Sequence, residues 1–177
     1  TTLFRSTTRV IVINGVSKLY GMTGFRIGWT VANRHLTEIM TNVQGQMTSC
    51  ASTVSQAAAE GALTGMQSVV ENLRMTIQNN RDVMLHELRS FTDVRVIPPD
   101  GTFYVLPDFR AYSNDSVELA HFLLRKAYVV TVPGAAFGME GTLRLSFSGT
   151  TDSLIEAIER IKWALDPNAP NEIYIGD

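Results

Sequence analysis

Apolar residues recur along the chain with two spacings, one typical of strands and one typical of helices. Short runs of apolar or alternating residues predict strands at the following ranges: Val10–Ile13, Thr30–Ala32, Val94–Ile97, Thr102–Leu106, Tyr128–Val132 and Thr142–Ser148. Apolar residues three and four positions apart predict helices at about 34–45, 54–63 and 116–127, one that follows a cap at Thr151 or Asp152 and runs to about Leu165, and a longer one that begins near Ser68. Asn33 and Asp115 are expected to cap the first and third of these helices. Strands and helices mixed in this way predict an α/β chain.

The first predicted strand, Val10–Ile13, is apolar on both faces. Such a strand is typical of the centre of a parallel sheet, where both faces are covered. The residues before it offer no strand with which it could pair. We therefore expect the 177 residues to be the C-terminal portion of a longer protein.

Composition excludes several classes of function. The chain is 45% hydrophobic and 18% charged, with a net charge of −2 and no basic tract, so we expect no nucleic-acid partner and no membrane partner. Cys50 is the single cysteine, and the three histidines are far apart in sequence, so we expect no metal site. No segment resembles a membrane span, and the first residues do not resemble a signal peptide, which favours a cytoplasmic location.

Candidate chemistry gathers in residues 14–29, directly after the first predicted strand. Lys18 and Arg26 are the two charged residues of this glycine-rich segment. We expect Lys18 to be held among apolar residues near a like charge, which disfavours its charged form and leaves a nucleophilic amine that can form a Schiff base with an aldehyde. Arg26 can bind a phosphate through two hydrogen bonds, and Ser17 adds a hydroxyl donor. An aldehyde and a phosphate on one small molecule describe pyridoxal phosphate.

A second candidate is Arg144, which lies inside a predicted strand. Alternation places Leu143, Leu145 and Phe147 on one face and Arg144 with Ser146 on the other. An arginine in a strand without a neighbouring acidic residue favours an anionic ligand. The alternative is an arginine that lies over the rim of the sheet.

The segment Ser17-Lys18-Leu19-Tyr20-Gly21-Met22-Thr23-Gly24-Phe25-Arg26-Ile27-Gly28 resembles the lysine motif of the class I/II, fold type I pyridoxal-phosphate aminotransferases. The resemblance implies that Lys18 is the catalytic lysine that holds the cofactor. It implies that Arg26 binds the cofactor phosphate together with Ser17, and that Arg144 binds the substrate carboxylate. Residues 101–104 and 133–138 also resemble family segments near the site.

The resemblance further implies a domain organisation and an activity. Residues 1–68 would be the end of the cofactor-binding large domain, and residues 69–177 would be a bridging helix and a small α+β domain. The activity would be amino-group transfer from an amino acid to a 2-oxo acid, in a homodimer. The other cofactor ligands of the family lie upstream of the lysine motif, so we expect the 177-residue chain alone to be inactive.

Three alternatives stay open at this point. Lyases and decarboxylases of the same fold use the same lysine and phosphate site. A non-catalytic fragment would bind no cofactor. A cofactor-free aldolase could use Lys18, but it would leave Arg26 and Arg144 unexplained as two separate anion sites.

Overall fold

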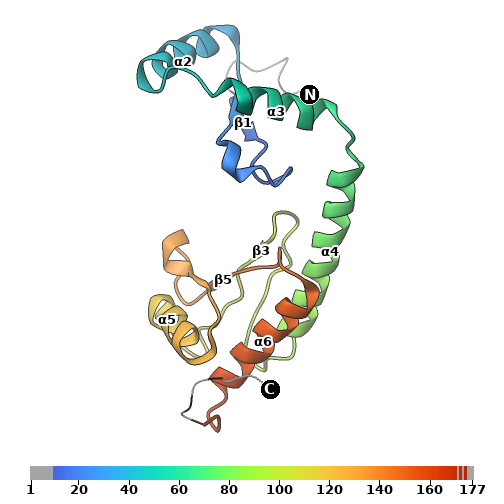
Figure 1. Cartoon of the computed structure of the whole chain (residues 1–177). Coiled ribbons are helices and arrows are strands. Elements are labelled where there is room, and N and C mark those ends of the chain that lie inside the picture. The colour runs from blue at the N-terminus through green and yellow to red at the C-terminus, as the bar shows by residue number, and fades with distance from the viewer. Residues whose placement is uncertain (1–9, 171, 173, 175–177) are drawn as a thin grey trace. The chain divides into compact units, whose positions relative to one another are not determined.

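The computed structural model describes residues 10–170, 172 and 174 (Figure 1). The chain forms two compact units, residues 1–72 and 73–177. The boundary between them falls inside helix α4, Ser68–Leu88. The assignment of residues 1–68 and 69–177 to a large and a small domain stays a prediction. Among the described residues, every helix is too short or too polar to cross a bilayer.

The first unit contains a hairpin and two helices. Strands β1, Val12–Gly15, and β2, Gly28–Val31, pair antiparallel, with Val12 opposite Val31 and Gly15 opposite Gly28. Helix α2, Arg34–Met47, begins as predicted at Asn33, whose Oδ1 accepts a hydrogen bond from the Leu36 amide at 2.9 Å. Helix α3 spans Thr53–Thr64.

The first strand differs from the prediction in its extent. It begins at Val12 and continues through Asn14 and Gly15, because these residues pair with Trp29 and Gly28. Within the described residues β2 is its one partner and the Ile13 side chain is 80% exposed, so the covered, central position expected for this strand in a longer protein stays a prediction. The apolar pattern was correct for a strand, but nothing in the described part of the chain covers its faces.

The second unit combines a three-stranded antiparallel sheet with helices. Strand β5, Leu143–Ser146, lies between β3, Tyr104–Val105, and β4, Val132–Pro133. A short 3-10 helix, η2, follows β4 over Gly134–Phe137. The remaining helices are α5, Ser116–Ala127, which contacts β4, and α6, Thr151–Leu165, which contacts α5.

Alternation along β5 is as predicted and ties the strand to the core. Leu143, Leu145 and Phe147 are buried, whereas Arg144 is half-buried and Ser146 is exposed. Buried side chains of α4, α5 and α6 pack with the apolar face of β5 in one cluster, which includes Leu88, Leu123 and Ile158. Arg144 is therefore held on a strand whose opposite face is fixed by the core.

All four strands predicted in the second unit are shorter than expected, and two of them differ most from the prediction. Val94–Ile97 makes one isolated bridge, from Arg95 to Asp108, because Pro98 and Pro99 cannot donate to a ladder. In the range Tyr128–Val132, Tyr128 has φ +54° and caps α5, so β4 starts at Val132. Val130 is 79% exposed, so the apolar run there did not mark a buried strand.

Candidate functional site

The hairpin loop between β1 and β2 contains three of the four predicted site residues. Its base is narrow because Gly15 and Gly28 face each other. A Cβ atom on Gly15 would lie 2.9 Å from the Ile27 carbonyl oxygen, and one on Gly28 would lie 2.7 Å from that of Asn14. Both positions therefore require glycine, and the two backbones are held together at the start and the end of the loop.

Inside the loop, Val16 is fully buried and organises the turn that follows it. Its carbonyl oxygen accepts hydrogen bonds from the amides of Tyr20, at 3.3 Å, and Met22, at 3.4 Å. The Tyr20 hydroxyl donates to Oε1 of Gln67 at 2.9 Å, directly before α4. Ser17 and Lys18 are therefore carried by a loop that is anchored on both sides of them.

Lys18 and Arg26 lie near the base of this loop, Lys18 after β1 and Arg26 before β2. Both side chains are exposed, and Ser17 is half-buried. The burial that we expected for Lys18 is thus absent from the described part of this chain. The donor set of an amine, a guanidinium and a hydroxyl on one short loop still fits an aldehyde that carries a phosphate.

Arg26 has a backbone conformation that is unusual for a residue with a side chain. Its φ is +49°, in the left-handed region, and it ends the 3-10 helix η1, Thr23–Phe25. One of its guanidinium nitrogens, Nη1, donates to the Thr23 carbonyl at 2.9 Å. An arginine has five N–H groups, so this bond uses only part of the hydrogen-bonding capacity of the guanidinium.

Arg144 lies in the second unit, on β5, between two aromatic rings. Its guanidinium carbon is 4.2 Å from the ring centroid of Tyr104 and 4.9 Å from that of Phe137. Among the described residues, no carboxylate forms an ion pair with it. The aromatic contacts are an addition that the sequence did not predict.

These aromatic contacts join the two other segments that resembled the family. Tyr104 belongs to residues 101–104 and Phe137 to residues 133–138, so both segments meet at Arg144. The sequence drew attention to each segment separately. It could not show that they converge, because the pairing of β3 and β4 with β5 is a long-range feature.

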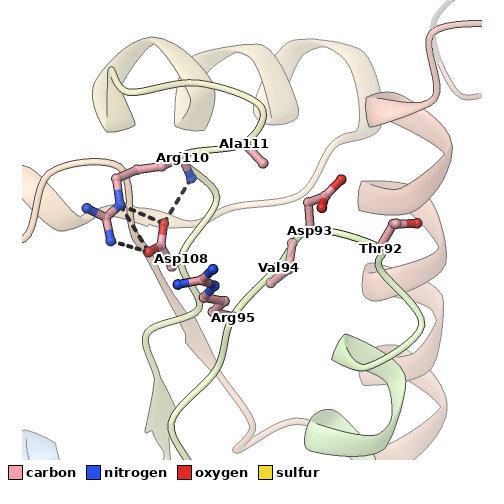
Figure 2. A pocket seen from close by; sticks show the side chains of 7 residues that line it. All are labelled: Thr92, Asp93, Val94, Arg95, Asp108, Arg110 and Ala111. Carbon is pink, nitrogen blue, oxygen red and sulfur yellow. Dashed lines mark hydrogen bonds and ion pairs between the residues drawn. The ribbon is translucent and has the colours of Figure 1, made fainter.

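A pocket of about 500 Å³ lies elsewhere in the second unit (Figure 2). It is lined by Thr92, Asp93, Val94, Arg95, Asp108, Arg110 and Ala111. Hydrogen bonds from Arg110 hold the pKa of the Asp108 carboxyl below its usual range. None of the predicted site residues lines this pocket, so it is separate from the candidate chemistry.

Glu140 is a carboxylate with partners in the loop around it. A side-chain hydrogen bond with Ser116, and then the Ser116 and Gly141 amides that donate to Oε1 at 2.7 Å and 3.3 Å, lower the pKa of Glu140. Within the described residues no group of three His, Cys, Asp or Glu side chains could hold a metal ion.

Comparison with known proteins decides the family. A family model described as aminotransferase class I and II matches residues 2–161. The chain belongs to this family. A probable aspartate/prephenate aminotransferase of Aquifex aeolicus is 38% identical over 159 residues, which are 87% of this chain and 40% of that protein. An aspartate aminotransferase of Rhizobium meliloti is 37% identical over 169 residues, which are 89% and 41%.

Solved structures of family members have the same fold. The aspartate aminotransferase of Rhizobium meliloti matches with a TM-score of 0.83 at 35% identity, over 90% of this chain and 42% of that one. An aspartate aminotransferase mutant of Thermus thermophilus matches with a TM-score of 0.85 at 32% identity, over 90% and 44%. The predicted family and the α/β fold class are therefore confirmed, and the chain spans about 40% of the length of these relatives.

Proposed function

We propose that this chain contributes its lysine and its carboxylate-binding arginine to a pyridoxal-phosphate-dependent aminotransferase. The reaction would transfer the amino group of an amino acid to a 2-oxo acid. The observation that carries the proposal is the family match over residues 2–161, which includes the loop with Lys18 and Arg26. The geometry of that loop supports it, because the glycine pair at the base fixes the segment that carries both cations.

The cofactor would be pyridoxal phosphate, held by three side chains of the loop. Lys18 would bind its aldehyde carbon, Arg26 would bind its phosphate with two parallel hydrogen bonds, and Ser17 would donate a third. When bound, the cofactor supplies an electron sink that stabilises negative charge at the substrate α-carbon. The hydrogen bond from Nη1 of Arg26 to the Thr23 carbonyl would orient the guanidinium before a ligand binds.

Lys18 would then act as the base and acid of the reaction. Its amine would hold the cofactor at rest and, when not so engaged, would take the proton from the substrate α-carbon and later return a proton. Arg144 would bind the α-carboxylate, which every amino acid and 2-oxo acid substrate has in common. Aspartate is the first donor to test, since the relatives are named for it.

The 177-residue chain alone is expected to lack this activity. It spans about 40% of the length of the relatives it matches. By resemblance to the family, further cofactor ligands lie upstream of the lysine motif, and the working enzyme is a cytoplasmic homodimer. Detectable transamination by the chain alone would contradict this part of the proposal.

The test of the Lys18 assignment is a titration of the chain with pyridoxal phosphate, followed by borohydride reduction and peptide mass mapping. We expect an absorption band and a reduced label on Lys18, both lost in Lys18→Ala. Lys162→Ala is the matched control, because Lys162 is an exposed lysine in α6. A label that Lys18→Ala leaves unchanged, or that falls equally on Lys162, would refute the assignment.

Lyase or decarboxylase activity is the second candidate, because the same lysine and phosphate site serves those reactions. The two activities can be distinguished by product analysis, with a protein of the full family length that contains this chain. Aminotransfer consumes the amino acid and the oxo acid in equal amounts. Decarboxylation releases carbon dioxide, and elimination releases a side-chain fragment.

A further inference from the structure

The guanidinium of Arg144 lies over two aromatic rings, one from the neighbouring strand β3 and one from η2, the short helix that follows the other neighbouring strand. Tyr104 is in β3 and pairs with Ser146, the next residue but one along β5. Phe137 ends η2, which directly follows β4, and Val132 of β4 pairs with Arg144 itself. The ring centroids lie 4.2 Å and 4.9 Å from the guanidinium carbon.

This enclosure leaves the hydrogen-bonding groups of Arg144 available. An arginine that lies over aromatic rings uses the faces of its guanidinium, and its N–H donors point outward in the guanidinium plane. Among the described residues no hydrogen bond or ion pair engages those donors. The rings therefore restrict the position of the group without using the atoms that would bind a carboxylate.

Packing fixes the start of the short helix that carries Phe137. Gly134, the first residue of η2, is buried against Thr142, the residue that precedes β5. A Cβ atom on Gly134 would lie 2.1 Å from Oγ1 of Thr142, and its amide donates to the Thr142 carbonyl at 2.8 Å. The short helix that ends in Phe137 is thus attached to the strand that carries Arg144.

We propose that Tyr104 and Phe137 are positioning residues that hold the Arg144 guanidinium ready for the substrate carboxylate. The proposal rests on the carboxylate-binding role proposed for Arg144. A free arginine side chain must give up rotamer freedom when it binds a ligand, and a side chain already enclosed by rings gives up less. A cation–π contact at an exposed site has a modest strength, so the loss of either ring should change the affinity for the substrate carboxylate roughly two- to fivefold.

The two rings are not part of the hydrophobic core, so their removal can be separated from unfolding. Neither Tyr104 nor Phe137 belongs to the core cluster of the second unit, whereas Phe103 packs against it. Phe137 is 47% exposed. Replacement of either ring by leucine should therefore loosen Arg144 more than it destabilises the fold.

The first measurement is the NMR resonance of the Arg144 Nε–Hε group in the 177-residue chain, assigned with Arg144→Lys. Aromatic rings over a guanidinium shift its protons through their ring currents. We expect this resonance to move toward the position of an exposed arginine in Tyr104→Leu and Phe137→Leu. Tyr104→Phe, which keeps the ring, and Tyr112→Leu, which removes a ring remote from Arg144, should leave it in place.

The second measurement uses a family-length active protein that contains this chain, with aspartate as the donor. Tyr104→Leu and Phe137→Leu should each raise KM roughly two- to fivefold and change kcat little, because the carboxylate is bound in both the ground and transition states. An unshifted Arg144 resonance in the wild type, or an unchanged KM in both leucine variants, would overturn the positioning role. A wild-type shift together with an unchanged KM in Arg144→Lys would instead overturn the proposed carboxylate role of Arg144.

Discussion

Helix α4 buries one polar side chain, Asn80, and its removal should strongly destabilise the second unit. Asn80 is 1% exposed. Its Nδ2 donates to the carbonyl of Phe147 at 3.1 Å and to that of Gly149 at 2.8 Å, and its Oδ1 accepts from Oγ1 of Thr151 at 3.0 Å. These three bonds attach α4 to the segment between β5, which carries Arg144, and α6.

The cost of Asn80→Ala can be worked from these bonds. A hydrogen bond contributes about 1 kcal/mol net, and a buried group left without its partner costs about 1–3 kcal/mol. The substitution removes three bonds at a buried position, so we expect a loss of about 3 kcal/mol in the free energy of unfolding. Alanine is also the better helix former by roughly 0.6 kcal/mol, which reduces the observed loss slightly.

The assay is urea unfolding followed by the fluorescence of Trp163 in α6, in a Trp29→Phe background that leaves one tryptophan. The matched control is Asn79→Ala, because Asn79 precedes Asn80 in the same helix and is exposed. The control makes the same change in helix propensity and should alter the stability by about 0.5 kcal/mol or less. The difference between the two variants isolates the buried hydrogen bonds.

A double-mutant cycle sharpens the test. Asn80→Ala and Thr151→Ala remove opposite ends of one hydrogen bond, so their effects should be non-additive by about 1 kcal/mol. The reasoning is refuted if Asn80→Ala destabilises no more than Asn79→Ala. Additive effects of the two alanines would refute the Thr151 contact alone.

Three further predictions concern the second unit. Gly134→Ala should lower the urea midpoint by more than an exposed alanine would, because its Cβ would lie 2.1 Å from neighbouring atoms; an unchanged midpoint contradicts this. Hydrogen bonds from Ser116 lower the folded pKa of Glu140, so its contribution to stability is present above its unfolded pKa and is lost as pH falls through the folded value. Glu140→Gln should therefore lower Tm at neutral pH and weaken the decline of Tm in acid, and parallel pH profiles would contradict it. Leu123→Ala, at a fully buried site, should cost about 2–5 kcal/mol in urea unfolding. Leu124→Ala, at a site 46% exposed, should cost much less, and similar losses would contradict the packing.

Features that depend on neighbouring residues could be predicted from the sequence. Asn33 and Asp115 cap their helices, and both are residue types that favour this position, since a cap needs a side chain and an amide only two or three residues away. For α6 the cap is Thr150, rather than the predicted Thr151 or Asp152. The alternation along Leu143–Ser146 was also predictable, because it follows from the strand period alone. The lysine motif could be found from the sequence for the same reason, since Ser17, Lys18 and Arg26 lie in one continuous segment.

Features that depend on distant segments were missed. Asn80 interrupts the apolar stripe of α4, and in sequence it gives no sign that Phe147, Gly149 and Thr151 satisfy it. The sequence likewise does not show that the Phe137 ring lies close to Arg144, because this contact depends on the pairing of β4 with β5. Strand pairing decides both contacts, and the local pattern does not encode which strands pair.

The exposure of β1 in this chain has a different origin, which lies in what apolar patterns measure. Buried residues of the described chain gather in the second unit, whereas the first unit buries Val16, Ser55 and Ala59 and leaves Ile13 and Ile39 exposed. An apolar pattern indicates that a surface is suited to burial, and it does not identify the segment that covers it. The pattern therefore predicted the strand correctly, and its burial in a longer protein stays a prediction. It follows that unfolding measurements on this chain report chiefly on the core around Leu123 and β5, and that the loop of Lys18 must be tested by ligand chemistry rather than by stability.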